Sequence, residues 1–330
     1  MAFPACLFLK RIIEGIAMKK DKKAGCGLNK KRKRWLVPLF FLLPHLTVFS
    51  IFNLLPDLAG IYAAFTRWDL GSTPQWIGLQ NLKTILFDSS SLFYWDFWWG
   101  LQNTVIFVLI TVPLRVIIPM LFALILNKKF PGRNLFQVLI YLPALLSLSV
   151  VMISWNYMFN SNYGLINTYL HLGSLSWMNT VPFNWIALII ITVWWGTGVN
   201  MIVLQSALAG VPQDLMEAAQ IDGAGRWKRF FRITLPCIKF PVTYVLTSSL
   251  IAEFNVWGQP YMFNNGGPII DMANGYAHQS NLMLMQVIRD VGFKGSFGSN
   301  PGIASAMALV LGAIMVTVSI MQVRMMRKGY

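Results

Sequence analysis

The chain has 330 residues, of which 56% are hydrophobic and only 12% charged, and its mean hydropathy is +0.56. This composition excludes a water-soluble domain, which could not cover its surface with so few polar residues. The net charge of +15 does not indicate nucleic-acid binding, because most of the 27 Lys and Arg residues flank apolar runs.

Six apolar runs are long enough to cross about 30 Å of hydrocarbon, which takes about 20 helical residues. They predict an all-α, polytopic membrane protein with a basic cytosolic tail at 1–34 and a transmembrane domain at 35–328. The six transmembrane helices are expected at 36–55, 101–126, 136–159, 185–205, 238–257 and 302–323.

The basic residues predict the orientation of the chain. They concentrate in the tail, at 128–133, at 226–239 and at 324–328. Because cytoplasmic loops are enriched in Lys and Arg, both termini and the segment around Glu217 are expected in the cytosol. The tail lacks the order of regions found in a secretory signal, and either Met1 or Met18 could be the true start.

Several kinds of site are not expected. The three cysteines form no Cys-x-x-Cys pair, and the three histidines have no second ligand at helical spacing. Neither a disulfide framework nor a metal site is therefore predicted. The chain also lacks the Gly-x-x-x-x-Gly-Lys-Ser/Thr phosphate loop of an ATPase, so we expect no bound nucleotide or other cofactor.

Two charged residues fall within the predicted spans. Arg115 in the second span must face the bundle, a partner subunit or water, and either structural pairing or function accounts for it. Glu253 in the fifth span is a functional candidate, because intramembrane carboxylates are costly. From polarity at membrane depth alone, the solute pathway is predicted to be lined by Asn156, Tyr244, Ser248 and Glu253.

The fourth span contains Gly196-Thr197-Gly198. Small residues within a membrane helix allow a neighbouring helix to approach closely. Because no strand precedes them, these glycines predict a helix contact rather than phosphate binding.

Two short helices are predicted between the fourth and fifth spans. Pro212 suits the first helical position, Asp214 lies in the opening turn where the helix dipole favours it, and Gly223 can supply a left-handed stop. A second helix is expected at 226–234, ended by Leu235-Pro236.

This pair of helices forms a compact knob. The small side chains of Ala218 and Ala219 allow another backbone to approach, so a partner that grips the knob could move the fourth and fifth spans. The alternative is an amphipathic element that rests on lipid with its basic residues at the level of the headgroups.

The spacing of Glu217-Ala218-Ala219, Gly223 and Ile233-Thr234-Leu235-Pro236 resembles the signature of membrane subunits of bacterial ATP-binding-cassette importers. Tyr141-Leu142-Pro143 and Gly266-Gly267-Pro268 narrow the resemblance to carbohydrate permeases of the maltose-transporter type. The resemblance covers roughly residues 34–328.

That resemblance implies how the chain works. Within a coupling loop at 210–236, the residues expected to contact the ATPase are Asp214, Glu217, Ala218, Ala219, Asp222, Gly223, Leu235 and Pro236. The implied partners are a second homologous permease, two cytosolic ATPase subunits that bind the ATP, an extracellular solute-binding protein and a carbohydrate. The implied location is the bacterial cytoplasmic membrane.

The sequence fits two other functions less well. An ion-coupled secondary transporter of a small polar solute would favour internal repeats and midplane carboxylates, and the chain offers one carboxylate and no obvious repeat. A membrane-embedded enzyme needs a cluster of His, Asp or Cys, and the spans contain no His-Glu-x-x-His motif or nucleophile elbow.

Overall fold

The computed structural model describes residues 40–69, 73–128, 130–271, 275–293 and 299–327. The tail predicted at 1–34 lies outside these residues. The chain divides into two compact units, 1–59 and 60–330.

The described part of the first unit is helical. An apolar helix runs from Phe40 to Ala64. It includes the π-helical turn η1 (Ser50–Leu54) and α3 (Leu55–Ala64). Its 25 residues are enough to cross a bilayer, so the structure confirms a first span and extends it to Ala64.

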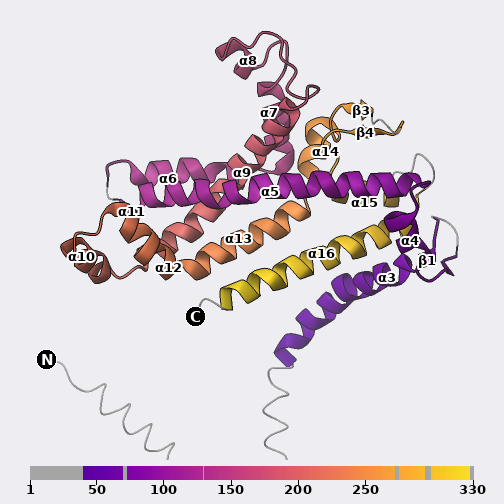
Figure 1. Cartoon of the computed structure of the whole chain (residues 1–330), viewed down its shortest axis with the longest axis horizontal. Helices are drawn as coiled ribbons and strands as arrows, with labels where there is room; N and C mark the ends of the chain where they lie inside the picture. Colours follow the sequence, from indigo (N-terminus) through magenta and orange to yellow (C-terminus); the bar gives the residue numbers. More distant parts are fainter. Residues whose placement is uncertain (1–39, 70–72, 129, 272–274, 294–298, 328–330) are drawn as a thin grey trace, which may run out of the picture. The chain divides into compact units, whose positions relative to one another are not determined.

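The second unit is almost entirely helical (Figure 1). Its helices are α4 (Gln80–Phe87), α5 (Leu92–Leu126), α6 (Arg133–Tyr141), η2 (Leu142–Leu145), α7 (Leu148–Met158), α8 (Leu165–Tyr169), α9 (Phe183–Ala209), α10 (Gln213–Ile221), α11 (Arg226–Arg229), η3 (Phe230–Thr234), α12 (Leu235–Cys237), α13 (Lys239–Phe254), α14 (Gly258–Asn264), α15 (Leu284–Phe293) and α16 (Pro301–Arg327). Its strands are β1 (Thr66–Arg67), β2 (Gln75–Trp76), β3 (Ile269–Asp271) and β4 (Ala277–Gln279), which form two antiparallel pairs.

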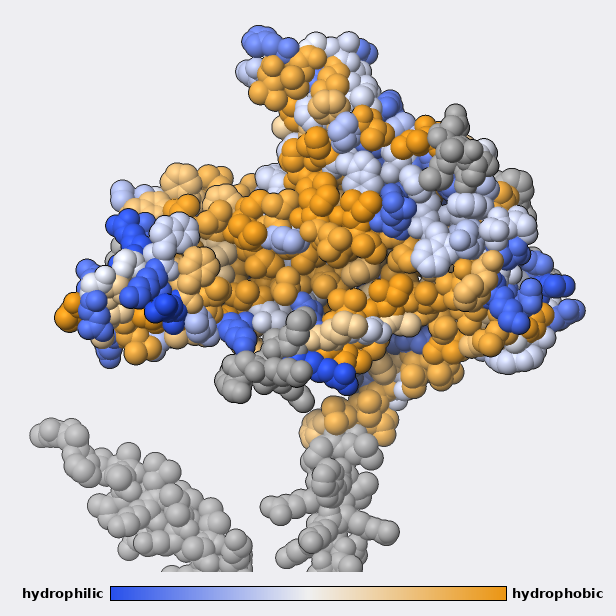
Figure 2. Space-filling model, viewed as in Figure 1, coloured by the Kyte–Doolittle hydropathy of each residue, from blue (hydrophilic) through white to orange (hydrophobic). Residues whose placement is uncertain are grey.

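Among the described residues of this unit, three unbroken helices are long and apolar enough to cross a membrane, as predicted: α5, α9 and the part of α16 up to Arg324. The helix α5 starts earlier than expected, at Leu92 instead of residue 101, because Ser91 caps it by accepting a hydrogen bond from the Phe93 N–H at 3.3 Å. Figure 2 shows hydrophobic side chains over the middle of this bundle and hydrophilic ones near α10 and α11 at one end.

The third predicted span, 136–159, is not one helix. The segments 133–145 and 148–158 meet at an angle of 102°. Pro143 lies in the short 3₁₀ turn η2, Leu146 is extended, and Ser147 caps the start of α7. A proline that cannot donate a hydrogen bond and a new N-cap four residues later explain the break.

The fifth predicted span is shorter than expected and is preceded by a bend. The helix α13 ends at Phe254 instead of residue 257, and Trp257 precedes α14. The helical segment 226–237 meets α13 at 74°. If each bent pair counts as one span, the described residues contain up to six spans.

The helix α5 lies at the centre of the packing, in contact with α9, α13 and α15, while α15 also packs on α16. The predicted close contact at Gly198 is present, since a Cβ atom there would lie 2.7 Å from the Cα of Tyr141. A tight turn follows α14, with Asn265, Gly266 and Gly267 at positive φ.

Candidate functional site

The first helix of the predicted knob is present as α10. Pro212 lies immediately before it and Asp214 lies in its first turn. Gly223 has a φ of +73°, the left-handed conformation that ends a helix, as predicted. The structure therefore confirms the helix, the place of Asp214 in its first turn and the glycine stop. It corrects the position of Pro212, which precedes the helix as its N-cap, with a non-helical ψ of 125°, instead of taking the first helical position.

The second helix of the knob is longer than predicted. The chain is helical from Arg226 through α11, the π-helical η3 and α12 to Cys237, so Leu235-Pro236 does not end it. Pro236 lies in α12, directly after the π-helical turn η3. The segment ends instead at Ile238, and α13 starts after it at an angle of 74°.

The predicted coupling residues lie on an open surface. Glu217, Ala218, Asp222, Gly223 and Pro236 are exposed, as is Asp214, while Ala219 and Leu235 are half-buried. The Glu217 carboxylate accepts a hydrogen bond from the Gln213 amide at 3.1 Å.

Two contacts tie the two helices of the knob together. The Arg229 guanidinium donates to the side-chain oxygen of Gln220 at 2.7 Å, and the Thr234 hydroxyl lies 3.7 Å from the sulfur of Met216. A force applied to α10 can therefore reach the segment that leads into α13.

Ile221 is a residue that the sequence reasoning missed. This side chain is 87% exposed at the end of α10, and Leu215 on the same helix is 49% exposed. Isolated apolar residues on a surface are ordinary, but two exposed ones on one short helix offer an apolar contact to a partner. The only sign of these two residues in the sequence was that both fall within the helix predicted between Pro212 and Gly223.

The charged residues within the spans meet each other. Arg115 on α5 and Glu253 on α13 form an ion pair, with side-chain exposures of 16% and 1%. The side-chain amide of Asn200 on α9 donates to the backbone oxygen of Arg115 at 2.9 Å and to the Ser249 hydroxyl at 3.2 Å. The polar groups of three helices therefore meet inside the bundle.

Gly196 on α9 makes room for this pair. A side chain at this position would overlap the Arg115 guanidinium. The glycine is therefore required by a charged side chain from a neighbouring helix, in addition to the helix packing expected from the sequence.

The four residues predicted to line the pathway do not form one cluster. Tyr244 and Ser248 lie one turn apart on α13, where Tyr244 is exposed and the Ser248 hydroxyl donates to the Val245 oxygen. Glu253 is buried against Arg115. Asn156 lies on α7 and donates to the backbone oxygen of Met262 in α14 at 3.2 Å.

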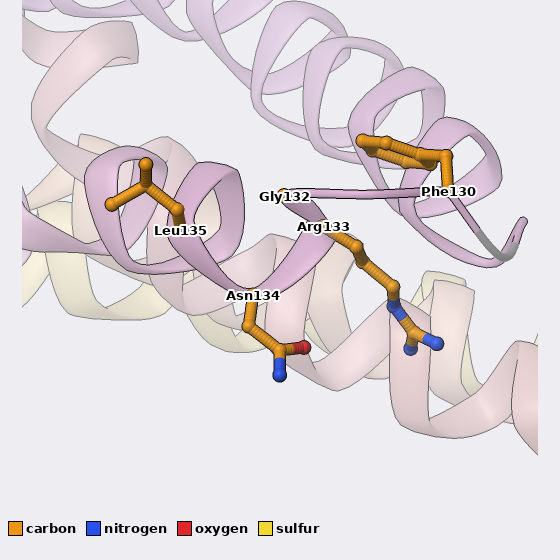
Figure 3. Close-up of a pocket in the computed structure, with 5 residues that line it drawn as sticks. All are labelled: Phe130, Gly132, Arg133, Asn134 and Leu135. Atoms are coloured by element: carbon orange, nitrogen blue, oxygen red, sulfur yellow. The ribbon is translucent and has the colours of Figure 1, made fainter.

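A shallow hollow of about 300 Å³ lies at the turn between α5 and α6. Figure 3 shows Arg133 and Asn134 extending to one side of the ribbon and Leu135 to the other. Gly132 has a φ of +82°, which explains the tight turn. Among the described residues, no group of three His, Cys, Asp or Glu side chains could hold a metal ion.

Comparison with known proteins matches residues 103–328 to the family model "Binding-protein-dependent transport system inner membrane component". The chain is 32% identical over 261 residues to a protein named "Probable ABC transporter permease protein YesP" of Bacillus subtilis, which covers 77% of this chain and 80% of that protein. It is also 32% identical over 232 residues to the "Trehalose/maltose transport system permease protein MalF" of Thermococcus litoralis, over 69% and 76% of the two chains.

The fold is similar to that of a solved structure. A chain from a bacterial ABC transporter involved in the import of the acidic polysaccharide alginate superposes with a TM-score of 0.73. The match covers 91% of this chain and 98% of that chain, at 24% sequence identity. This likeness establishes a common arrangement of helices.

Proposed function

Because the chain belongs to the family of binding-protein-dependent transport system inner membrane components, we propose that it forms half of a carbohydrate pathway and couples to a separate ATPase through residues 212–234. The pathway is shared with a second homologous permease, and an extracellular binding protein delivers the solute. Both termini face the cytosol, and the chain itself holds no cofactor.

The carbohydrate assignment rests on relatives. One is named for trehalose and maltose transport and another, 31% identical over 271 residues, for arabinooligosaccharide transport. The exposed Tyr244 and half-buried Ser248 on α13 supply an aromatic ring and a hydroxyl, which suit the apolar faces and hydroxyl groups of a sugar.

The observation that carries the coupling role is the exposed acidic helix α10. The helix α10 lies at the end of the bundle where α5 ends and α6 begins (Figure 1), and it is followed by Gly223 in the left-handed conformation. The segment that follows is separated from α13 by one residue, Ile238. Movement of a partner that holds α10 would therefore be transmitted to a membrane span.

The coupling role is tested by Glu217→Lys, which reverses the charge of an exposed side chain. We expect the variant to insert and fold normally but to lose co-purification with the ATPase and ATP-dependent uptake. Lys83→Gln, on the exposed surface of α4, serves as the matched control and should retain both. Normal ATPase assembly and normal uptake by Glu217→Lys would contradict the proposal.

The energy source is tested separately in cells that express the complete transporter. Depletion of ATP should stop uptake, while collapse of the proton gradient at constant ATP should not. Uptake that persists without ATP and follows the gradient would favour an ion-coupled transporter.

A further inference from the structure

The two halves of the knob carry opposite charges. The stretch 213–222 contains Asp214, Glu217 and Asp222 and no Lys or Arg. The stretch 226–232 contains Arg226, Lys228, Arg229 and Arg232 and no Asp or Glu. An anionic surface would therefore attract the second stretch and repel the first.

The second stretch presents two rows of exposed side chains. Trp227 and Phe231 are 76% and 57% exposed, and their rings stack with centroids 6.0 Å apart. Lys228 and Arg232, each one position further along the chain, are also exposed. Residues four apart lie on one side of a helix, so an aromatic row runs beside a basic row.

A neighbouring face of this stretch packs against the bundle. Thr234 is buried, and Phe230 packs on the hydrophobic core that contains Ile238 and Val245. The stretch is therefore fixed in orientation, and its aromatic and basic rows face outward.

The angle between helices places this stretch near the plane of the membrane. The segment 226–237 meets α13 at 74°, close to perpendicular, and α13 belongs to a predicted span. In Figure 1, α11 and α12 lie at the end of the bundle where α5 ends and α6 begins, and α10 extends beyond them. A helix in this position, with aromatic and basic side chains exposed, has the features of an interfacial helix.

We propose that Arg226–Thr234 binds the anionic lipid headgroups of the cytoplasmic leaflet. Trp227 and Phe231 enter the boundary between headgroups and acyl chains, and Lys228 and Arg232 contact lipid phosphates. Because Arg229 is bonded to Gln220, the lipid contact also sets the position of α10 relative to the membrane. Repulsion of its carboxylates from the same lipids directs α10 toward the cytosol.

The test uses the full-length permease pair in nanodiscs, with and without its ATPase. The discs contain either a photoactivatable phosphatidylglycerol or the matching phosphatidylcholine, and crosslinked peptides are mapped by mass spectrometry. We expect peptides spanning 226–239 to crosslink preferentially to phosphatidylglycerol, with and without ATPase. In the unmodified chain, that preference should fall as salt is raised.

Two pairs of substitutions sharpen the test. Lys228→Gln with Arg232→Gln should reduce the preference for phosphatidylglycerol roughly thirtyfold, at about 1 kcal/mol for each basic residue. Arg67→Gln with Lys83→Gln, which removes two exposed basic residues elsewhere, should leave it unchanged.

Three results would overturn the proposal. Equal crosslinking by the two lipids would show that the headgroup charge is not recognised. A preference for phosphatidylglycerol that does not change with salt in the unmodified chain would also show that charge is not recognised. Complete loss of crosslinking when the ATPase is added would assign the aromatic and basic rows to the ATPase instead of the membrane.

Discussion

Arg115 on α5 and Glu253 on α13 form an ion pair inside the membrane domain, although 138 positions separate them in the chain. The pair joins the central helix of the bundle to the helix that begins one residue after the coupling segment. It therefore fixes α13 against α5 near the end of α13 that lies away from the coupling segment.

A double-mutant cycle should reveal this pair. Arg115→Met or Glu253→Leu alone leaves a buried charge without its partner, and each should lower the free energy of unfolding by about 3–5 kcal/mol. The combined variant should lose much less, because two apolar side chains replace the two charges. The measurement is unfolding of the purified permease in mixed micelles by titration with a denaturing detergent.

The same series separates stability from transport. If the pair only holds the fold, the combined variant recovers uptake along with stability. If α13 must be held by a charged contact during the cycle, stability recovers and uptake does not. A combined loss equal to the sum of the two single losses would show that the residues do not interact.

The glycines of α9 and α16 should respond differently to the same substitution. At Gly198 a Cβ would lie 2.7 Å from the Ile140 oxygen and from the Tyr141 Cα, both backbone atoms that cannot rotate away. Gly198→Ala should therefore cost about 1–3 kcal/mol of stability. At Gly312 a Cβ would meet nothing within 4 Å, so Gly312→Ala should be neutral or stabilising by up to about 1 kcal/mol. Equal effects of the two changes would contradict the close packing of α9.

Much of this architecture could be predicted from local sequence. Hydropathy located the spans, because each run must bury its backbone hydrogen bonds in lipid. Turn chemistry located α10 and its end at Gly223, since few residues other than glycine adopt that φ. These features depend on residues close together in the chain.

Features that depend on distant residues could not be predicted. Both Arg115 and Glu253 were recognisable as costly in the membrane, but nothing local indicates that they meet. The continuation of the knob to Cys237 was missed, because Pro236 reads as a helix stop unless the preceding π-helical turn is known. The exposure of Ile221 likewise depends on how α10 lies against the bundle.

Ile221→Ala should weaken assembly with the ATPase. The side chain is 87% exposed in the isolated chain, and burying it against a partner would contribute about 1.5–3 kcal/mol. We expect the dissociation constant to rise by about tenfold or more, measured by titration of ATPase onto immobilised permease. Because the residue is already exposed, the stability of the permease alone should not change. Unaltered ATPase affinity would exclude Ile221 from the contact.

A histidine in the β3–β4 pair should make that region sensitive to pH. His278 is buried, stacks on Trp99 with ring centroids 5.2 Å apart, and has its Nδ1 3.8 Å from an Asp96 carboxylate oxygen. The ring of Tyr276 also packs on His278, with ring centroids 4.7 Å apart. Burial lowers the pKa of His278 below its ordinary value of 6.5.

The sign of the effect follows from that direction. The unfolded segment binds a proton near pH 6.5, whereas the folded one resists protonation until a lower pH. The stabilisation is therefore fully present above about pH 6.5 and is lost as the pH falls from there through the folded pKa.

Hydrogen exchange of residues 277–284 measures this loss directly. Exchange, corrected for its intrinsic pH dependence, should become faster between pH 7.5 and pH 5.5. His278→Phe keeps an aromatic ring against Trp99 and cannot take up a proton, so the change with pH should disappear. His171→Asn, at an exposed position with a φ of +53°, should leave the change intact. A pH response that survives in His278→Phe would assign it to another group.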